Sequence, residues 1–297
     1  MIPDPHTTRL WRWLASLTFI AVAILACTRE SHEAVKSESA KKRRIVAVGG
    51  AVTETVFALG AGDEVVAVDT SSVYPDAAAK APKVGYQRTL SAEGVLSFTP
   101  DLVIVADEAG PPAAIEQLRS AGIRVERMPT ATDLESTIAR TIAIGAVLDC
   151  PTADLVAKLR ADTSAALARV PANGPRFVLM FARGAGSMVA AGDDTSGSAM
   201  VRLAGGTPAV SGFTGYKALS AEALIAAAPE VIVVPAHTLK TGGGIDGILK
   251  LPGIAETPAG TSRRIVAFDD LLLLGFGPRL AQGIDELARA LVASPST

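Results

Sequence analysis

The chain has 297 residues, of which 49% are hydrophobic and 20% are charged, so it has room for one large globular domain or two of ordinary size. Its formal net charge of −2 gives no electrostatic preference for nucleic acid or for an anionic membrane surface, and we expect neither as a partner. Aromatic residues make up only 4% of the chain, so tyrosines placed in loops are conspicuous.

Residues 1–27 have the features of a signal peptide. Two arginines form a basic start, and an uncharged apolar run follows over residues 14–26. Such a run is too short to span a bilayer comfortably and is typical of a signal-peptide core. It ends at Cys27, in a sequence that resembles the cleavage box of a bacterial lipoprotein and favours lipidation of that cysteine. Ordinary secretion, with cleavage at a nearby alanine, is the alternative.

Residues 28–42 are polar and charged, which is typical of a flexible tether. Cys150 is the only other cysteine, and we expect no disulfide between it and Cys27 in the leader. The stability of the fold must therefore come from the burial of apolar surface.

Residues 43–132 show strands and helices in alternation. Apolar strands are expected at 44–48, 65–68, 102–106 and 123–125, helices at 52–59, 91–97 and 111–121, and a loop at 69–81. Strands that are apolar throughout and separated by helices are typical of a parallel sheet covered on both faces. We therefore predict a first α/β lobe over these residues.

Two helices without an intervening strand follow, at 133–148 and 153–168, so residues 133–170 are expected to form a helical connector. Residues 171–297 then repeat the earlier pattern. Strands are expected there at 177–181, 231–234 and 265–268, and helices at 195–203, 219–227, 247–251 and 279–292. The predicted fold class is α/β, with two lobes that contain parallel sheets, a helical connector and a ligand cleft between the lobes.

One stretch occurs twice. Gly85-Tyr86 is followed by Leu90-Ser91-Ala92-Glu93, and Gly215-Tyr216 is followed by Leu219-Ser220-Ala221-Glu222. In both places a proline, an acidic residue and an apolar strand come next. Chance similarity between two αβ units is the alternative, and the shared Leu-Ser-Ala-Glu weakens it.

The expected position of the binding site follows from the fold. In parallel α/β sheets ligands bind beyond the carboxyl ends of the strands, which here means the cleft between the lobes. From the first lobe, the loops at 49–50, 69–88 and 107–108 are expected to line it. From the second lobe we expect Arg183, Tyr216 and His237.

Several kinds of catalytic site are disfavoured. Gly49-Gly50 is not followed by a dinucleotide-binding or phosphate-binding motif, so a tight turn between strand and helix is the better interpretation. His237 is the only histidine in the predicted fold, because the other two lie in the leader and the tether. This argues against a histidine-rich metal site and against a Ser-His triad. We therefore expect a protein that is not an enzyme.

Tyr86 is the strongest candidate for ligand binding. Gly85 frees the backbone before it, and Arg88 follows closely enough to stabilise a phenolate. A phenolate is a hard donor that suits ferric iron, and tyrosine is a known axial ligand of haem. The alternative is a tyrosine packed at the edge of a lobe with its hydroxyl in water.

The chain from about Arg44 onward resembles the haem-specific periplasmic binding proteins of bacterial ABC importers, within the helical-backbone class that also carries cobalamin and ferric siderophores. The most specific residues are Lys83-Val84-Gly85-Tyr86-Gln87-Arg88. The others are Gly49–Glu54, Leu90–Gly94, Ala109–Pro112, Ala190–Gly192, Gly215–Lys217, Gly243–Gly247 and Leu273–Arg279.

The resemblance implies that ferric haem is the transported ligand and that Tyr86 is its axial ligand. Arg88, Arg183 and Tyr216 lie on loops expected to line the cleft, so we expect them to contact the haem. Some members of the family place a histidine opposite the iron, whereas the corresponding stretch here, Phe181-Ala182-Arg183, has none. For His237 three roles stay open: a sixth ligand of the iron, a partner of a haem propionate, or a polar residue at the rim.

The resemblance also implies the partners. It predicts an exported monomer, periplasmic or anchored by lipid outside the cytoplasmic membrane, that delivers haem to an ABC permease dimer and its ATPase. Glu93 and Glu222, one per lobe, are the expected docking residues, and a local role at a helix N-terminus is the alternative. A carrier of cobalamin or a ferric siderophore is the nearest alternative function, and a nucleotide-using α/β enzyme is an alternative from another class.

Overall fold

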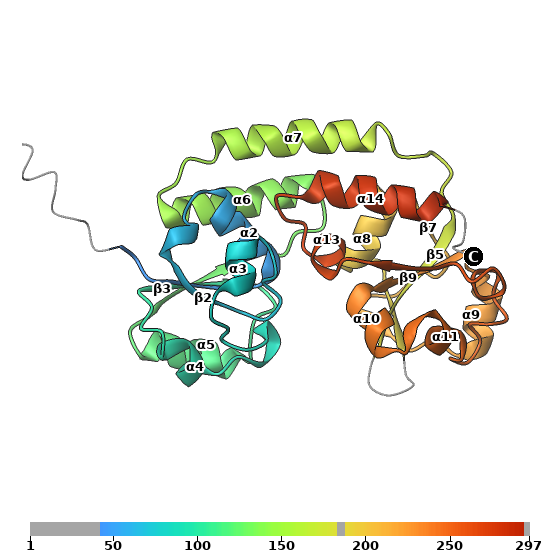
Figure 1. The fold of residues 1–297 in the computed structure, drawn as a ribbon, viewed down its shortest axis with the longest axis horizontal. Coiled ribbons are helices and arrows are strands. Elements are labelled where there is room, and N and C mark those ends of the chain that lie inside the picture. The colour runs from blue at the N-terminus through green and yellow to red at the C-terminus, as the bar shows by residue number, and fades with distance from the viewer. Residues whose placement is uncertain (1–41, 183–187, 294–297) are drawn as a thin grey trace, which may run out of the picture. The chain divides into compact units, whose positions relative to one another are not determined.

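Four parallel strands form the sheet of the first half, in the order β2-β1-β3-β4. They are β1 (Ile45–Val48), β2 (Val65–Val68), β3 (Leu102–Ala106) and β4 (Arg124–Met128). The computed structural model describes residues 42–182 and 188–293, and the four predicted strands are present in it (Figure 1). Every residue of the central strands β1 and β3 is buried, which is why they are apolar without alternation.

Helices cover both faces of this sheet. The helices of the first half are α2 (Gly50–Ala58), α3 (Asp76–Lys80), α4 (Ala92–Leu96) and α5 (Pro112–Ser120), with 3₁₀ turns at Gly62–Glu64 and Gln87–Thr89. Alternate residues of β1 pack on opposite faces: Ile45 lies in a cluster with Val52 of α2, and Val46 lies in a cluster with Leu118 of α5. The loop expected at 69–81 contains the short helix α3, which the sequence analysis missed.

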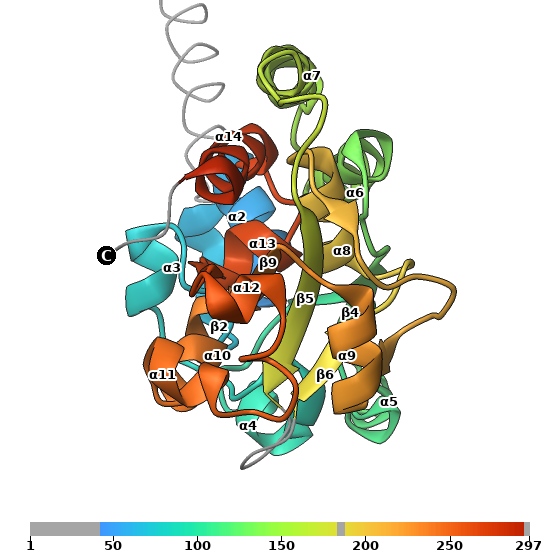
Figure 2. The same cartoon turned by 90° about the vertical axis from the view of Figure 1, so that its right-hand side faces the viewer.

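Two long helices follow the first sheet, α6 (Leu134–Leu148) and α7 (Ala153–Leu167), as predicted. Asp133 and Ser136 form a capping box at the start of α6. Asp149, in a left-handed conformation, ends it. Helix α7 lies outermost in both views, beyond α6 and α14 (Leu280–Val292) (Figures 1 and 2).

The sheet of the second half is mixed rather than purely parallel. Its strands are β5 (Arg176–Ala182), β6 (Met188–Ala191), β7 (Thr207–Pro208), β8 (Tyr216–Lys217), β9 (Val231–Pro235) and β10 (Ile265–Phe268). Strands β10, β9 and β5 are parallel, as predicted. Strand β6 is antiparallel to β5, and β8 is antiparallel to β6. Because β6, β7 and β8 are short, their hydrophobic pattern was too brief to predict them.

The remaining helices cover this second sheet. They are α8 (Ser196–Leu203), α9 (Ala221–Ala227), α10 (Ala236–Thr241), α11 (Gly244–Leu249), α12 (Pro258–Thr261), α13 (Asp270–Leu274) and α14. The turn expected at 247–251 is α11, which begins earlier. Val233 of β9 packs with α8 and α14, whereas Ile232 packs with α9 and α11. Within the described ranges, none of the helices is both long and apolar enough to cross a membrane.

The repeated stretch forms the same local structure in both halves. The Ser91 hydroxyl accepts a hydrogen bond from the backbone N–H of Gly94 at 3.2 Å, which begins α4. The Ser220 hydroxyl accepts one from the N–H of Ala223 at 3.2 Å, which begins α9. A parallel strand follows each helix, β3 in the first half and β9 in the second. The sequence repeat therefore corresponds to a repeated αβ unit.

Candidate functional site

Tyr86 lies on a loop that hydrogen bonds hold from both sides. The backbone N–H of Thr70 donates to the Gly85 carbonyl at 2.9 Å, and the N–H of Gly110 donates to the Gln87 carbonyl at 2.9 Å. Gly85 has a φ of +96°, a conformation that favours glycine. The chain can therefore turn before Tyr86, whose side chain is 45% exposed. The loop presents the phenol instead of burying it.

A buried carboxylate lies at the start of the segment that leads from β2 to this loop. Asp69 follows β2 directly, is fully buried, and accepts hydrogen bonds from the backbone N–H groups of Gly49 at 2.8 Å and Ser71 at 2.9 Å. The hydroxyls of Ser71 and Ser72 donate to its two oxygens at 2.5 Å. Asp69 was not among the site residues expected from the sequence. The signal was an acidic residue directly after an apolar strand and just before two serines.

Gly49-Gly50 forms a tight turn between β1 and α2, as the sequence analysis preferred. A Cβ atom on Gly49 would lie 2.7 Å from the Cβ of Ala106, and the φ of Gly49 is +105°. The backbone N–H of Gly49 is already paired with Asp69, and that of Gly50 donates to the Ser71 hydroxyl at 3.2 Å. These donors serve the fold and are not free to hold a phosphate.

Tyr216 lies in the second half on the edge strand β8, and 44% of it is exposed. Its ring meets Phe181 of β5 edge to face, with 5.1 Å between the ring centroids. The carboxylate of Asp194 accepts a hydrogen bond from the N–H of Gly215 at 2.7 Å, and Asp193 accepts one from the N–H of Gly212 at 2.7 Å. Two acidic residues thus hold the turn that leads into Tyr216.

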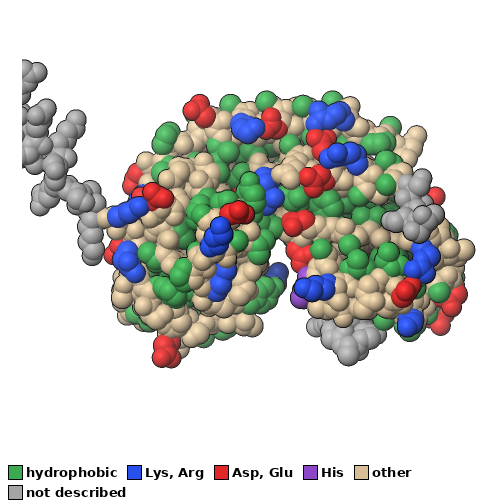
Figure 3. Space-filling model, viewed as in Figure 1, with side chains coloured by type: hydrophobic (Ala, Val, Ile, Leu, Met, Phe, Trp, Pro, Cys, Tyr) green, Lys and Arg blue, Asp and Glu red, His purple; other side chains and the backbone are tan. Residues whose placement is uncertain are grey.

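Electrostatic interactions connect Tyr216 with the first half. Partial burial raises the pKa of the Tyr216 phenol, and the Arg88 guanidinium opposes this rise. The charges of Asp194 and Glu108 raise the same pKa further, as does Tyr86. Arg88, Glu108 and Tyr86 belong to the first half, so charged and polar groups of that half lie near enough to Tyr216 to act on its phenol. Figure 3 shows the surface hollowed between the halves, on the side away from α7.

Tyr86 and Arg88 thus lie within electrostatic reach of Tyr216, and the assignment of these three residues to one ligand site stays a prediction. His237 is exposed at the start of α10, directly beyond the carboxyl end of β9, and its backbone N–H donates to Asp270 at 3.2 Å. Arg183 and Cys27 lie outside the described residues.

Glu93 and Glu222 occupy equivalent places in α4 and α9, each exposed in the first turn of its helix. Hydrogen bonds from its own backbone N–H and from the Ser220 hydroxyl lower the pKa of the Glu222 carboxyl. Both glutamates are therefore available to a partner, and Glu222 also contributes to its own helix terminus.

Two further observations concern other kinds of site. Among the residues that the structure describes, no three His, Cys, Asp or Glu side chains lie close enough together to hold a metal ion. A surface depression of about 450 Å³ lies beside α14, away from the tyrosine loops. It is lined by Arg169, Pro171, Asp285, Ala288, Arg289 and Val292.

Comparisons with known proteins extend over most of the chain. A family profile described as periplasmic binding protein matches residues 45–271. The structure of the periplasmic heme-binding protein BhuT with two hemes is 43% identical, with a TM-score of 0.77, and the match covers 84% of this chain and 97% of BhuT. RhuT of Roseiflexus sp. RS-1, a periplasmic heme-binding protein in apo form, is 41% identical, with a TM-score of 0.80 and coverage of 84% and 98%.

Among sequence relatives, the uncharacterized ABC transporter substrate-binding lipoprotein YvrC of Bacillus subtilis (strain 168) is 27% identical over 256 residues, covering 84% of this chain and 80% of YvrC. These relatives are transport-associated binding proteins, and the two-lobe fold of the structural neighbours is the fold described above.

Proposed function

Because the chain belongs to the periplasmic binding protein family, we propose that it captures ferric haem in the cleft between its halves and delivers it to an ABC importer. One observation carries the proposal: Tyr86 and Tyr216 are both exposed, and Tyr86 and Arg88 of the first half act electrostatically on the Tyr216 phenol of the second. The haem-binding neighbours, similar over nearly their whole length, support the choice of ligand.

In this proposal the Tyr86 phenolate binds the ferric iron. A phenolate is a suitable ligand for ferric haem, and the Arg88 cation favours that charged form. The positive φ of Gly85 and the hydrogen bond that its carbonyl accepts from Thr70 fix the backbone directly before Tyr86, and the fold thereby restrains where the phenol can lie.

The second half supplies the opposite wall. Tyr216 and Phe181 form an aromatic pair that suits the face of a porphyrin. Arg183 and His237 are proposed as polar contacts of the same ligand. Haem is the cargo of the protein, and we propose binding and release without catalysis.

Delivery requires a partner in the membrane. We propose that Glu93 and Glu222 meet basic residues on the two subunits of an ABC permease, with a monomer of this protein docking on the dimer. Export by the leader, followed by lipidation of Cys27, would hold the protein close to that permease. The lipoprotein relative supports this arrangement.

A titration tests the proposal. The purified protein without its leader is mixed with ferric haem, and the visible spectrum is followed for saturable binding and for a phenolate-to-iron charge-transfer band. Cyanocobalamin and a ferric siderophore are titrated in parallel and then as competitors. Saturation by haem with no competition supports haem capture. Saturation by cobalamin or the siderophore alone would contradict it and identify the alternative carrier.

A further inference from the structure

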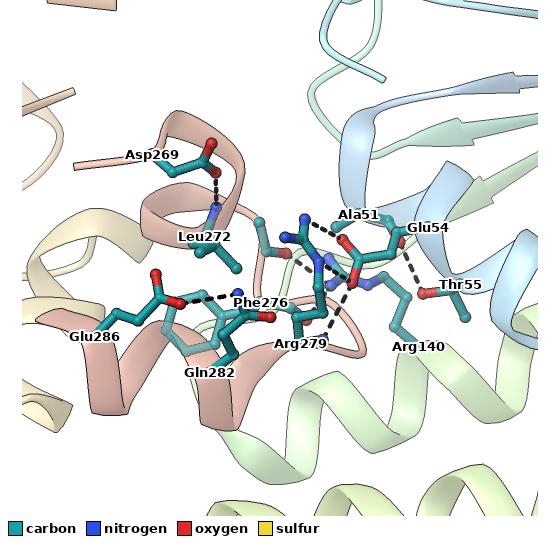
Figure 4. Close-up of polar contacts among 11 residues, drawn as sticks. Ala51, Glu54, Thr55, Arg140, Asp269, Leu272, Phe276, Arg279, Gln282 and Glu286 are labelled. Atoms are coloured by element: carbon teal, nitrogen blue, oxygen red, sulfur yellow. Dashed lines mark hydrogen bonds and ion pairs between the residues drawn. The ribbon is translucent and has the colours of Figure 1, made fainter. Parts of the chain in front are cut away.

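An ion pair between a buried carboxylate and a partly buried arginine joins the two halves. Glu54 of α2 is only 3% exposed, and Arg279 at the start of α14 contributes its partner cation. Arg279 donates to the Glu54 carboxylate from Nε and from Nη2 at 3.0 Å, and its backbone N–H donates at 3.1 Å (Figure 4). The side chains thus meet in a bidentate arrangement, which fixes their relative orientation as well as their distance.

The same guanidinium contacts the loop that leads to Tyr86. The Cζ atom of Arg279 lies 3.6 Å from the centroid of the Tyr74 ring. Tyr74 belongs to the segment between Asp69 and Gly85, and Gly85 accepts the hydrogen bond from Thr70 immediately before Tyr86. Arg279 therefore contacts both helix α2 of the first half, through Glu54, and the segment that leads to Tyr86, through Tyr74.

A second arginine makes a similar bridge. Arg140 of α6 is buried and donates from Nη2 to the carbonyls of Gly275 at 2.8 Å and Phe276 at 2.5 Å. Burial lowers the pKa of Arg140 to about 10, so the side chain stays charged at neutral pH. Phe276 is itself buried in the core of the second half. Both halves are thus joined by charged side chains (Figure 4).

Packing leaves little space along this seam. A Cβ on Gly50 would lie 2.6 Å from Leu271, and a Cβ on Gly275 would lie 3.4 Å from the Cβ of Ala51. The start of α2 and the segment around α13 are therefore in direct contact. Such close packing leaves a small change at the seam little room to be absorbed locally.

We propose that Arg279 and Glu54 form a latch between the halves that sets the width of the cleft and the position of the Tyr86 loop, and so controls how long haem is retained. This inference rests on the proposed function for its ligand. In this role both are positioning residues, because neither is proposed to touch the haem.

Stability alone does not account for such a pair. Apolar side chains of similar size usually stabilise a buried contact as well as an ion pair does, because charges lose their hydration on burial. An ion pair adds a defined geometry, and its charges regain hydration when the halves separate. Those properties suit a contact that must hold a cleft at one width and yet be opened when the cargo is released.

The test measures the distance between the halves directly. Ser120 of α5 and Glu256 beyond α11 are exposed, so Ser120→Cys and Glu256→Cys carry spin labels in a Cys150→Ser background of the protein without its leader. Pulsed electron spin resonance is recorded for this protein and for its Arg279→Gln, Arg279→Lys and Glu54→Gln variants. Haem dissociation from each variant is followed by transfer to excess apomyoglobin.

We expect the latch variants to give a shifted and broader distance distribution between the spin labels. We also expect them to release haem about tenfold faster or more, because a loss of affinity appears mostly in the dissociation rate. Arg279→Lys keeps the positive charge but loses the planar guanidinium that binds the carboxylate through two nitrogens, so it should resemble Arg279→Gln. Tyr74→Phe keeps the aromatic face and should behave as wild type.

Leu287→Ala is the matched control, since Leu287 is fully buried in α14 and belongs to the core of the second half. It should lower the melting temperature with the distance distribution unchanged. If the latch variants do the same, the pair is only a stabilising contact and the proposal is wrong. If the wild-type protein binds no haem, the proposed function fails, and the distances in the ligand-free protein still decide whether the latch exists.

Discussion

The Asp194 carboxylate accepts a 2.7 Å hydrogen bond from the backbone N–H of Gly215, the residue immediately before Tyr216. One acidic side chain therefore acts on the second tyrosine in two ways. It fixes the turn that presents the phenol, and its charge raises the pKa of that phenol.

We predict that Asp194→Asn lowers the pKa of Tyr216 towards its ordinary value of about 10, because the neutral amide no longer disfavours the phenolate. Ultraviolet titration of tyrosinate absorbance, with Tyr216→Phe to identify the group, measures the change. Asp193→Asn is the control, since Asp193 holds the N–H of Gly212 instead. Because the folded pKa is raised, the contribution of Tyr216 to stability is complete below about pH 10 and is lost at higher pH. An unchanged titration in Asp194→Asn would refute the assignment.

Tyr86→Phe is expected to abolish the phenolate-to-iron charge-transfer band of the haem complex. The change removes the oxygen that is proposed to bind iron and keeps the ring. The chain has three tyrosines, so Tyr74→Phe and Tyr216→Phe are natural controls that should keep the band. Visible absorption and resonance Raman spectra of the ferric complex provide the measurement. A band that persists in Tyr86→Phe and disappears in Tyr216→Phe would move the axial ligand to the second half.

His237→Ala is expected to leave the charge-transfer band in place, because Tyr86 supplies the phenolate. Electron spin resonance of the ferric complex then reports the coordination number. Conversion of a six-coordinate signal to a five-coordinate one would identify His237 as the second axial ligand. An unchanged signal with a modest loss of affinity would identify it as a propionate partner.

Reversal of both docking charges is expected to impair delivery and to leave capture intact. The double variant Glu93→Lys and Glu222→Lys changes two exposed side chains at equivalent helix starts. Haem affinity should match wild type, whereas stimulation of the cognate transporter's ATPase in vesicles should be lost. Glu116→Lys on α5 controls for a general effect of surface charge. Normal stimulation by the double variant would restrict both glutamates to their local roles.

Asp69→Ala is expected to lower the free energy of unfolding by about 1–3 kcal/mol or more, since each buried donor left without a partner costs about that much. The donors are the N–H groups of Gly49 and Ser71 and two serine hydroxyls. Urea unfolding measures the change. Asp162→Ala, on the exposed face of α7, should change stability by no more than about 1 kcal/mol. Equal effects of the two substitutions would show that the Asp69 network adds nothing to the fold.

The local elements were predictable from sequence because neighbouring residues decide them. The apolar runs of β1, β3 and β9 lie in short stretches, and the structure confirms them as strands. The Tyr86 loop was singled out for the same reason: glycine, tyrosine and arginine stand within four positions of each other.

The tertiary structure decided what depends on residues that are distant in the chain. Glu54 and Arg279 are 225 positions apart, and neither residue by itself indicates a partner. Strand β8 consists of two exposed residues, and it is a strand because these residues pair with the backbone of β6. Its position brings Tyr216 within the electrostatic influence of Arg88. A sequence pattern indicates which face of an element is buried, whereas a contact between the halves depends on how the two sheets are joined.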